Sequence, residues 1–129
     1  MVISKFLGRI LMLDALSCLA MGAALVIGTD LLAPLFGLEP GFALGAGLAL
    51  LPVGLLILWT GTRNQVPAML VYAIIAGNAL WILESLVTAA TFPTITPAGT
   101  AFVIAQAASV ALLTILEMMG VRRSITTAL

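Results

Sequence analysis

The sequence predicts an all-α membrane protein, an antiparallel up-down bundle of four transmembrane helices in a single domain over residues 1–129. Three observations indicate this fold class. Apolar residues make up 63% of the chain and charged residues only 8%, a balance more apolar than a soluble domain of this size needs. The apolar residues gather in four stretches, each long enough to cross a bilayer as a helix. Basic residues occur only at alternate ends of these stretches.

The four spans are separated by short segments that contain Pro, Gly, Asn or Thr. We expect the spans at about 10–29, 42–61, 67–90 and 97–119. The first stretch also resembles a secretory signal, with a basic start and an apolar core. It is expected to remain as a span, because Asp14 interrupts that core and mostly apolar residues continue after Cys18.

The basic residues predict the orientation. Lys5 and Arg9 precede the first span, Arg63 lies between the second and third, and Arg122 and Arg123 follow the fourth. The other two connections contain no Lys or Arg. Because cytoplasmic loops carry an excess of Lys and Arg, both termini are predicted to be cytoplasmic. The expected location is a bacterial inner membrane, with the lipid bilayer as the surrounding partner.

The connection after the first span is too short to cross the membrane and too apolar for a free loop. We expect residues 30–37 to form a short helical segment along the top of the bundle. Asp30 is expected to cap it, and Leu35 and Phe36 to be buried. At the second outer turn, Thr96 is the expected cap of the fourth span.

Small residues recur at four-residue spacing in three of the spans. Such residues allow a neighbouring helix to approach closely. The repeats are Ala20, Ala24 and Gly28; Gly41, Gly45 and Ala49; and Ala101, Ala105 and Ser109. This pattern is typical of packing faces and indicates no particular activity.

Composition argues against several functional classes. The chain has no His and one Cys, so the commonest metal and haem ligand is missing. No metal or cofactor is expected, and no nucleophile with an adjacent base indicates an enzyme. The net charge is zero and the basic residues are dispersed, which argues against nucleic acid as a partner.

Glu84 is the most unusual residue, because an ionisable side chain within a span often marks a functional site. We expect it to form a polar intramembrane cluster with four residues of the third and fourth spans: Asn78, Trp81, Ser85 and Gln106. One interpretation is a site for a proton, a cation or a small polar solute. The favoured interpretation is interhelical hydrogen bonding, with Glu84 facing the interior or the outer interface near Gln106.

A second polar set is expected at the cytoplasmic ends of the first and fourth spans. Asp14 and Glu117 are predicted to form interfacial ion pairs that fix helix register. Their partners would be the arginines at the same level, which are Arg9, Arg63, Arg122 and Arg123. The alternative interpretation is a docking surface for a cytosolic or membrane partner.

Three segments resemble small uncharacterised four-helix inner-membrane proteins of bacteria. They are Asn78-Ala79-Leu80-Trp81 with Ser85; Pro97-Ala98-Gly99-Thr100-Ala101-Phe102-Val103 with Ala105-Gln106-Ala107; and Leu116-Glu117-Met118-Met119-Gly120-Val121-Arg122-Arg123. The resemblance implies a four-helix membrane fold and no activity.

The sequence leaves three functional hypotheses. The first is a non-enzymatic accessory or assembly subunit, or a small homo-oligomer, that acts through helix packing with other membrane subunits or with itself. The second is a small transporter or channel that uses Glu84, Asn78 and Gln106. The third is a binder of lipid or of another hydrophobic ligand.

Overall fold

The computed structural model describes residues 1–128, with side chains as far as Ser124. Over this range the chain is all-helical. Its helices are α1 (Lys5–Ile27), α2 (Thr29–Phe36), α3 (Pro40–Thr62), α4 (Ala68–Thr91) and α5 (Pro97–Ala128). Among these, α1, α3, α4 and α5 are long and apolar enough to cross a membrane. The prediction of four such helices is confirmed.

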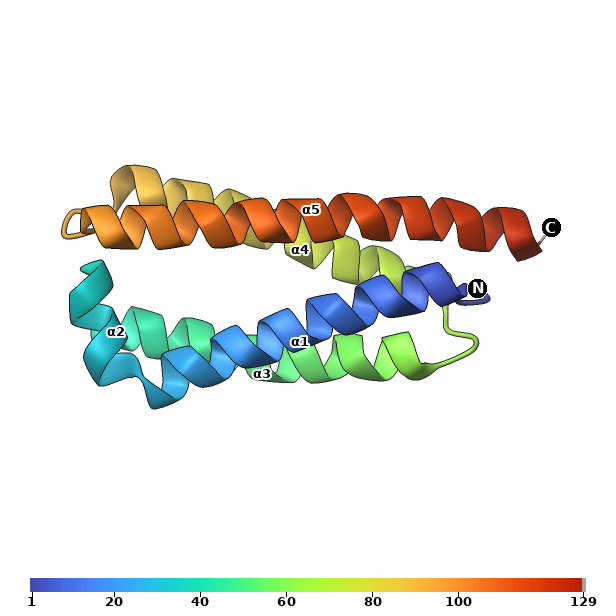
Figure 1. The fold of residues 1–129 in the computed structure, drawn as a ribbon, viewed down its shortest axis with the longest axis horizontal. Coiled ribbons are helices and arrows are strands. Elements are labelled where there is room, and N and C mark those ends of the chain that lie inside the picture. The colour runs from blue at the N-terminus through green and yellow to red at the C-terminus, as the bar shows by residue number, and fades with distance from the viewer. Residues whose placement is uncertain (129) are drawn as a thin grey trace.

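The long helices form two closely packed pairs. Helix α1 packs along α3, α4 packs along α5, and contacts between α1 and α5 join the pairs. Helices α3 and α4 approach each other far less closely. Both termini lie at one end of the molecule, and α2 lies at the other (Figure 1). The ring of helices is therefore least closed between α3 and α4.

The first helix begins earlier than the sequence predicted. The Ser4 side chain caps α1 by accepting a hydrogen bond from the Leu7 amide, 3.1 Å away. The residues before Ser4 pair with the α3–α4 connection, where the Ile3 amide donates to the Asn64 carbonyl at 2.8 Å. The helix thus begins five residues before the predicted start of the first span at about residue 10, and Asp14 lies about 14 Å along the helix from Lys5.

The predicted short segment is α2, but only part of its expected packing is found. Phe36 stacks on Phe102 of α5 with ring centroids 4.4 Å apart, and Ala33 is buried. Leu35 is 52% exposed, contrary to the prediction. A two-turn helix presents one inward face, and Leu35 is turned about 200° away from Ala33. Asp30 lies in the first turn of α2 and is not its cap residue.

At the end of the molecule that holds α2, hydrogen bonds join the connection between α4 and α5 to the end of α2. Thr94 donates through Oγ1 to the Gly37 carbonyl at 2.7 Å, and Thr96 through Oγ1 to the Leu35 carbonyl at 2.8 Å. The Thr96 hydroxyl also accepts from the Gly99 amide at 3.0 Å, which confirms it as the cap of α5. Gly37 ends α2 with a positive φ of 68°, a conformation that favours glycine.

Glycines set the close contact between α1 and α3. A Cβ atom at Gly47 would lie 2.9 Å from the Gly22 carbonyl oxygen and 2.9 Å from the Cβ of Leu25. Gly45, two residues earlier on α3, faces the opposite way and has no atom within 4 Å of such a Cβ. The predicted small-residue repeat containing Gly45 therefore lies on the outer surface, and a different glycine makes the internal contact.

Gly47→Ala is expected to lower the free energy of unfolding by about 1–3 kcal/mol, because the added methyl group overpacks a backbone contact. Gly45→Ala is the matched control. It should leave stability unchanged or raise it by up to about 1 kcal/mol, since alanine favours the helix. Unfolding of both variants in mixed micelles, followed by circular dichroism, measures the difference. Equal stability of the two variants would contradict the close α1–α3 packing.

Candidate functional site

A pair of buried acidic residues is bridged by one amide. Asn78 of α4 donates through Nδ2 to Asp14 Oδ2 of α1 at 2.8 Å and to Glu117 Oε1 of α5 at 2.8 Å. The exposed fractions of Asp14, Asn78 and Glu117 are 1%, 7% and 0%. Three helices that are far apart in sequence thus contribute one polar group each. We name these three residues the acid pair site.

The four carboxyl oxygens of this site have unequal partners. Asn78 donates a hydrogen bond to one oxygen of each carboxyl group. The Cys18 thiol donates to Asp14 Oδ1 with a sulfur–oxygen distance of 3.8 Å. Glu117 Oε2 is buried and has no hydrogen-bond partner in the described part of the chain. The two carboxyl groups lie side by side, because one nitrogen, Asn78 Nδ2, donates to both. A hydrogen bond between them would require a proton on one of them.

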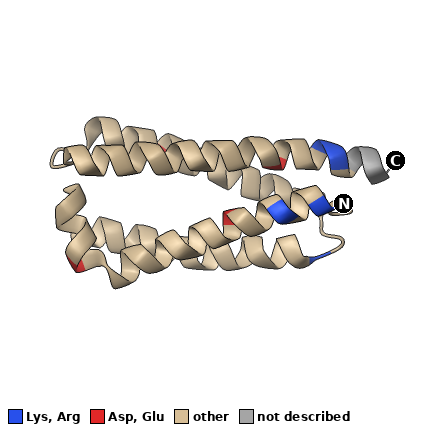
Figure 2. Ribbon diagram, in the orientation of Figure 1, with Lys and Arg blue, Asp and Glu red and all other residues tan. Residues whose placement is uncertain are grey.

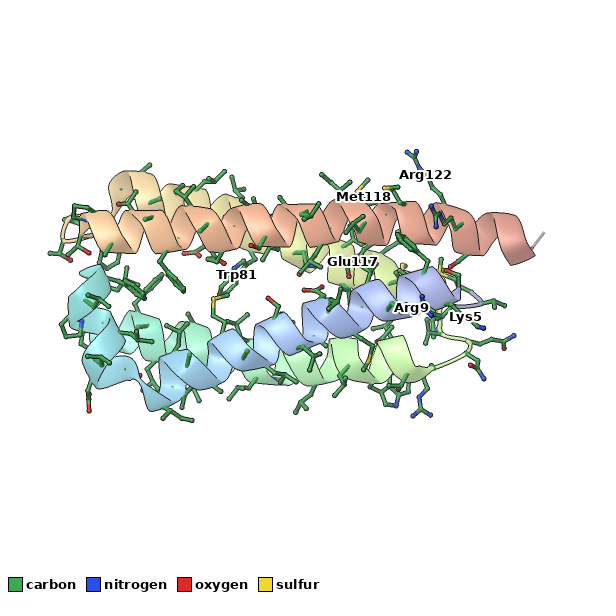
Figure 3. The ribbon with its side chains drawn as sticks, in the orientation of Figure 1. Lys5, Arg9, Trp81, Glu117, Met118 and Arg122 are labelled. Carbon is green, nitrogen blue, oxygen red and sulfur yellow. The ribbon has the colours of Figure 1, made fainter. Side chains whose placement is uncertain are left out.

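The two acidic residues of the predicted cytoplasmic ion pairs are therefore not at the surface of the molecule. Asp14 and Glu117 lie inside the bundle and accept hydrogen bonds from Asn78. The earlier start of α1 explains why Asp14 is deep in the helix. Glu117 lies between α5 and α1, on the inner side of α5 (Figure 3).

The basic side chains make different contacts at the end that holds both termini (Figure 2). The Arg63 guanidinium lies 5.3 Å from the Trp59 ring centroid, and the Arg123 guanidinium lies 4.3 Å from that of Phe6. These are cation–π contacts. Lys5, Arg9 and Arg63 line a surface pocket of about 620 Å³ at this end. The basic residues thus share one end of the molecule, as the sequence predicted.

Three of the predicted intramembrane polar residues do meet. Trp81 donates through Nε1 to Gln106 Oε1 at 2.8 Å, and Gln106 donates through Nε2 to Ser85 Oγ at 2.8 Å. Ser85 in turn donates to the Trp81 carbonyl at 2.7 Å. We name these three residues the outer polar cluster. Asn78 is not part of it, because it lies about one turn nearer the basic end and bonds to the acid pair.

Glu84 lies apart from the outer polar cluster. Its side chain is exposed and accepts a hydrogen bond from the Thr88 hydroxyl, Oγ1 to Oε1, at 2.9 Å. Ser85 is buried, and one residue along a helix turns the side chain by about 100°. The expectation that Glu84 bonds within one cluster with Asn78 and Gln106 is therefore corrected.

A surface groove runs between α3 and α4 beside Glu84, with a volume of about 430 Å³. Its lining consists of Gly41, Phe42, Gly45, Ala46, Gly77, Leu80, Trp81 and Glu84. We name it the α3–α4 groove. Gly45 and Gly77 in its lining have no atom within 4 Å of an added Cβ. The groove is apolar apart from the Trp81 indole and the Glu84 carboxyl.

Two smaller cavities lie further inside. One of about 50 Å³ touches both the groove residue Glu84 and the outer polar cluster. The other, of about 40 Å³, touches Asn78 and Cys18. Trp81 lines the groove and both cavities, and it lies between α5 and α1 in Figure 3. The indole thus separates the region around Glu84 from the acid pair site.

The described part of the chain contains no group of three or more His, Cys, Asp or Glu side chains placed to hold a metal ion. Comparisons with protein-family models, with curated proteins and with solved structures find no match for this chain. Its function therefore has to be argued from its own residues.

Asn78→Leu should destabilise the bundle, because it keeps a similar volume and removes the amide that donates to two buried carboxyl groups. A buried group left without its partner costs about 1–3 kcal/mol. Gln106→Leu is the control, since hydrogen bonds between membrane helices average about 0.6 kcal/mol. Unfolding in mixed micelles should show the larger loss for Asn78→Leu. A larger loss for Gln106→Leu would contradict a stabilising role for the acid pair site.

Proposed function

We propose that this chain is a non-enzymatic integral membrane protein of a bacterial inner membrane. It crosses the bilayer four times as an antiparallel bundle, with both termini in the cytoplasm. Four long apolar helices and a single basic end support this arrangement (Figure 2). The transporter hypothesis that combined Glu84, Asn78 and Gln106 loses support, because the three residues bond in three different places. Asn78 bonds in the acid pair site, Gln106 in the outer polar cluster, and Glu84 with Thr88.

Reporter fusions test the orientation. A reporter fused after Leu38 or after Thr94 is expected to read periplasmic, since both connections lie at the end without basic residues. A reporter fused after Arg63 is the matched control and should read cytoplasmic. Cytoplasmic signals from the Leu38 and Thr94 fusions would overturn the proposed topology.

Within the membrane, we propose that the protein is an accessory or assembly subunit and that the α3–α4 groove holds a helix of another membrane protein. The exposure of Glu84 beside a groove lined by glycines is the observation that carries this proposal. Small residues let a helix approach closely. Gly45 and Gly77 make no such approach within this chain, so their faces are free for a second helix.

The position of Glu84 argues that something covers it. The residue lies about 10 Å from the end of α4 at Thr91, which places it within the hydrocarbon core of a bilayer that α4 crosses. An acidic side chain facing lipid at the centre of a helix costs about 3 kcal/mol on insertion scales. A partner helix that offers a hydrogen-bond donor or a cation removes much of this cost.

Charge complementarity indicates a different protein and not a second copy. Every Lys and Arg of this chain lies at the opposite end from α2 (Figure 2). A copy with the same orientation therefore brings no cation to the level of Glu84. The partner we propose has a transmembrane helix with small residues facing the groove and a Lys, Arg or amide side chain near its periplasmic end.

A photoreactive amino acid at Gly77 tests this proposal in intact membranes. The position has open space around it, so the fold should be retained. We expect a crosslink to a transmembrane helix of a second protein, reduced several-fold by Glu84→Ala. The sequence of the crosslinked peptide should contain a basic or amide residue at the level of Glu84.

The control places the same photoreactive residue at Ala108, on the exposed face of α5 and outside the groove. It should give no crosslink to that protein. Crosslinks from Gly77 to copies of this chain would instead support a homo-oligomer, and adducts with lipid alone would support a lipid groove. Either result would overturn the accessory-subunit proposal.

A further inference from the structure

We propose that Asp14, Asn78 and Glu117 form a proton-binding site, in which the two carboxyl groups take up and release a proton as one unit. This proposal goes beyond the accessory role and does not depend on it. Its basis is the acid pair bridged by one amide together with the unpartnered, fully buried Glu117 Oε2.

The first argument concerns charge. Two ionised carboxyl groups side by side in a buried site repel each other, and each has lost its hydration. Asn78 is neutral and has two N–H donors, both already used for this pair. A proton shared by the two groups removes one negative charge. It also supplies a donor that the pair lacks, since the two carboxyl groups accept from the same nitrogen and so lie side by side.

The second argument distinguishes a proton from a metal cation. Asn78 points its N–H donors at both carboxyl groups, whereas a metal ion would need its carbonyl oxygen there. The described residues also provide no third acidic ligand at this position. The donor set therefore fits a proton.

Each helix brings few titratable, charged or polar side chains near the acid pair site. On α1 the titratable neighbour is Cys18, and Arg9 lies five residues before Asp14. On α3 the buried polar side chain near the end of the molecule with the basic residues is Thr60, whose hydroxyl donates to the Leu56 carbonyl. On α4 the titratable side chains nearest to Asn78 in sequence are Tyr72 and Glu84, both exposed and each six residues away. On α5 Arg122 follows Glu117 by five residues.

The cavity beside Asn78 offers a route for proton exchange. Its volume of about 40 Å³ exceeds the ~10–15 Å³ that one water molecule needs. Ser17, Cys18, Asn78 and Trp81 give it polar partners. The Cys18 thiol lines this cavity and donates to Asp14 Oδ1. It can pass its proton to the carboxyl pair while taking one from water in the cavity, and the reverse step releases the proton. The carboxyl pair then gains or loses one positive charge in total.

Infrared difference spectroscopy of the full chain in lipid nanodiscs tests the site. We expect the stretching band of a protonated carboxyl group at neutral pH, where carboxyl groups in water are ordinarily ionised. The band should shift in D₂O, and it should move on ¹³C labelling of aspartate or of glutamate. The double variant with Asp14→Asn and Glu117→Gln should lose it completely.

Glu84→Gln is the matched control and should keep the band, because Glu84 lies outside the acid pair site. Labelling leaves the protein unchanged, so glutamate and aspartate labelling in the Glu84→Gln background tests the proposal even where the double variant does not fold. Absence of a protonated carboxyl band in this background at neutral pH would overturn the proposal. A band that neither label shifts would overturn it equally.

Discussion

The bridge from Asn78 to Asp14 and Glu117 is the interaction on which the arrangement of the helices depends. The α1–α3 and α4–α5 pairs each have their own apolar packing, and the backbones of α1 and α4 do not approach closely. The Asn78–Asp14 bond crosses this space directly. Since all three side chains are buried, any sliding or rotation of one pair against the other leaves a polar group without a partner. The bridge therefore fixes register where apolar contacts alone allow movement.

The two sides of the bundle differ in how they are closed. Gly22 and Gly47 bring α1 and α3 into contact, and there the small residues are used within the chain. Between α3 and α4, Gly45 and Gly77 have open space around them, and the groove remains at the surface. Packing in a membrane depends on van der Waals contact, because lipid is as apolar as the side chains. A glycine face without contacts inside this chain is thus a surface where a second helix gains the most van der Waals contact.

The sequence was sufficient for the helices and insufficient for the pairing of their polar residues. Span positions follow from apolar length, and the clustering of basic residues at one end follows from the alternation of charge. The depth of Asp14 was misjudged, because the start of α1 is set by the Ser4 cap and the pairing of Ile3 with Asn64. A cap residue followed by an unbroken helical pattern was the signal available for this start.

The direction of the side chains explains why the polar residues of α4 do not form the single predicted cluster. Periodicity places Asn78, Trp81 and Ser85 on one face of α4, and all three do point inward or partly inward. It says nothing about which neighbour each residue meets, since that depends on the tilt between helix pairs. Asn78 bonds to Asp14 of α1 and Glu117 of α5, while Trp81 bonds to Gln106 of α5, so the residues of the one predicted cluster lie in two sites. Glu84 lies one residue outside the inward face, which turns it to the groove.

The position of Trp81 connects the two proposed sites. Its indole bonds to Gln106 and at the same time lines the α3–α4 groove and the cavity beside Asn78. A helix in the groove and water in the cavity would both contact this ring. Because a packed indole moves as a rigid plate, a shift on one side displaces volume on the other. Trp81 is thus the side chain through which occupancy of the groove and protonation of Asp14 and Glu117 can influence each other, and such coupling is reciprocal by thermodynamic linkage.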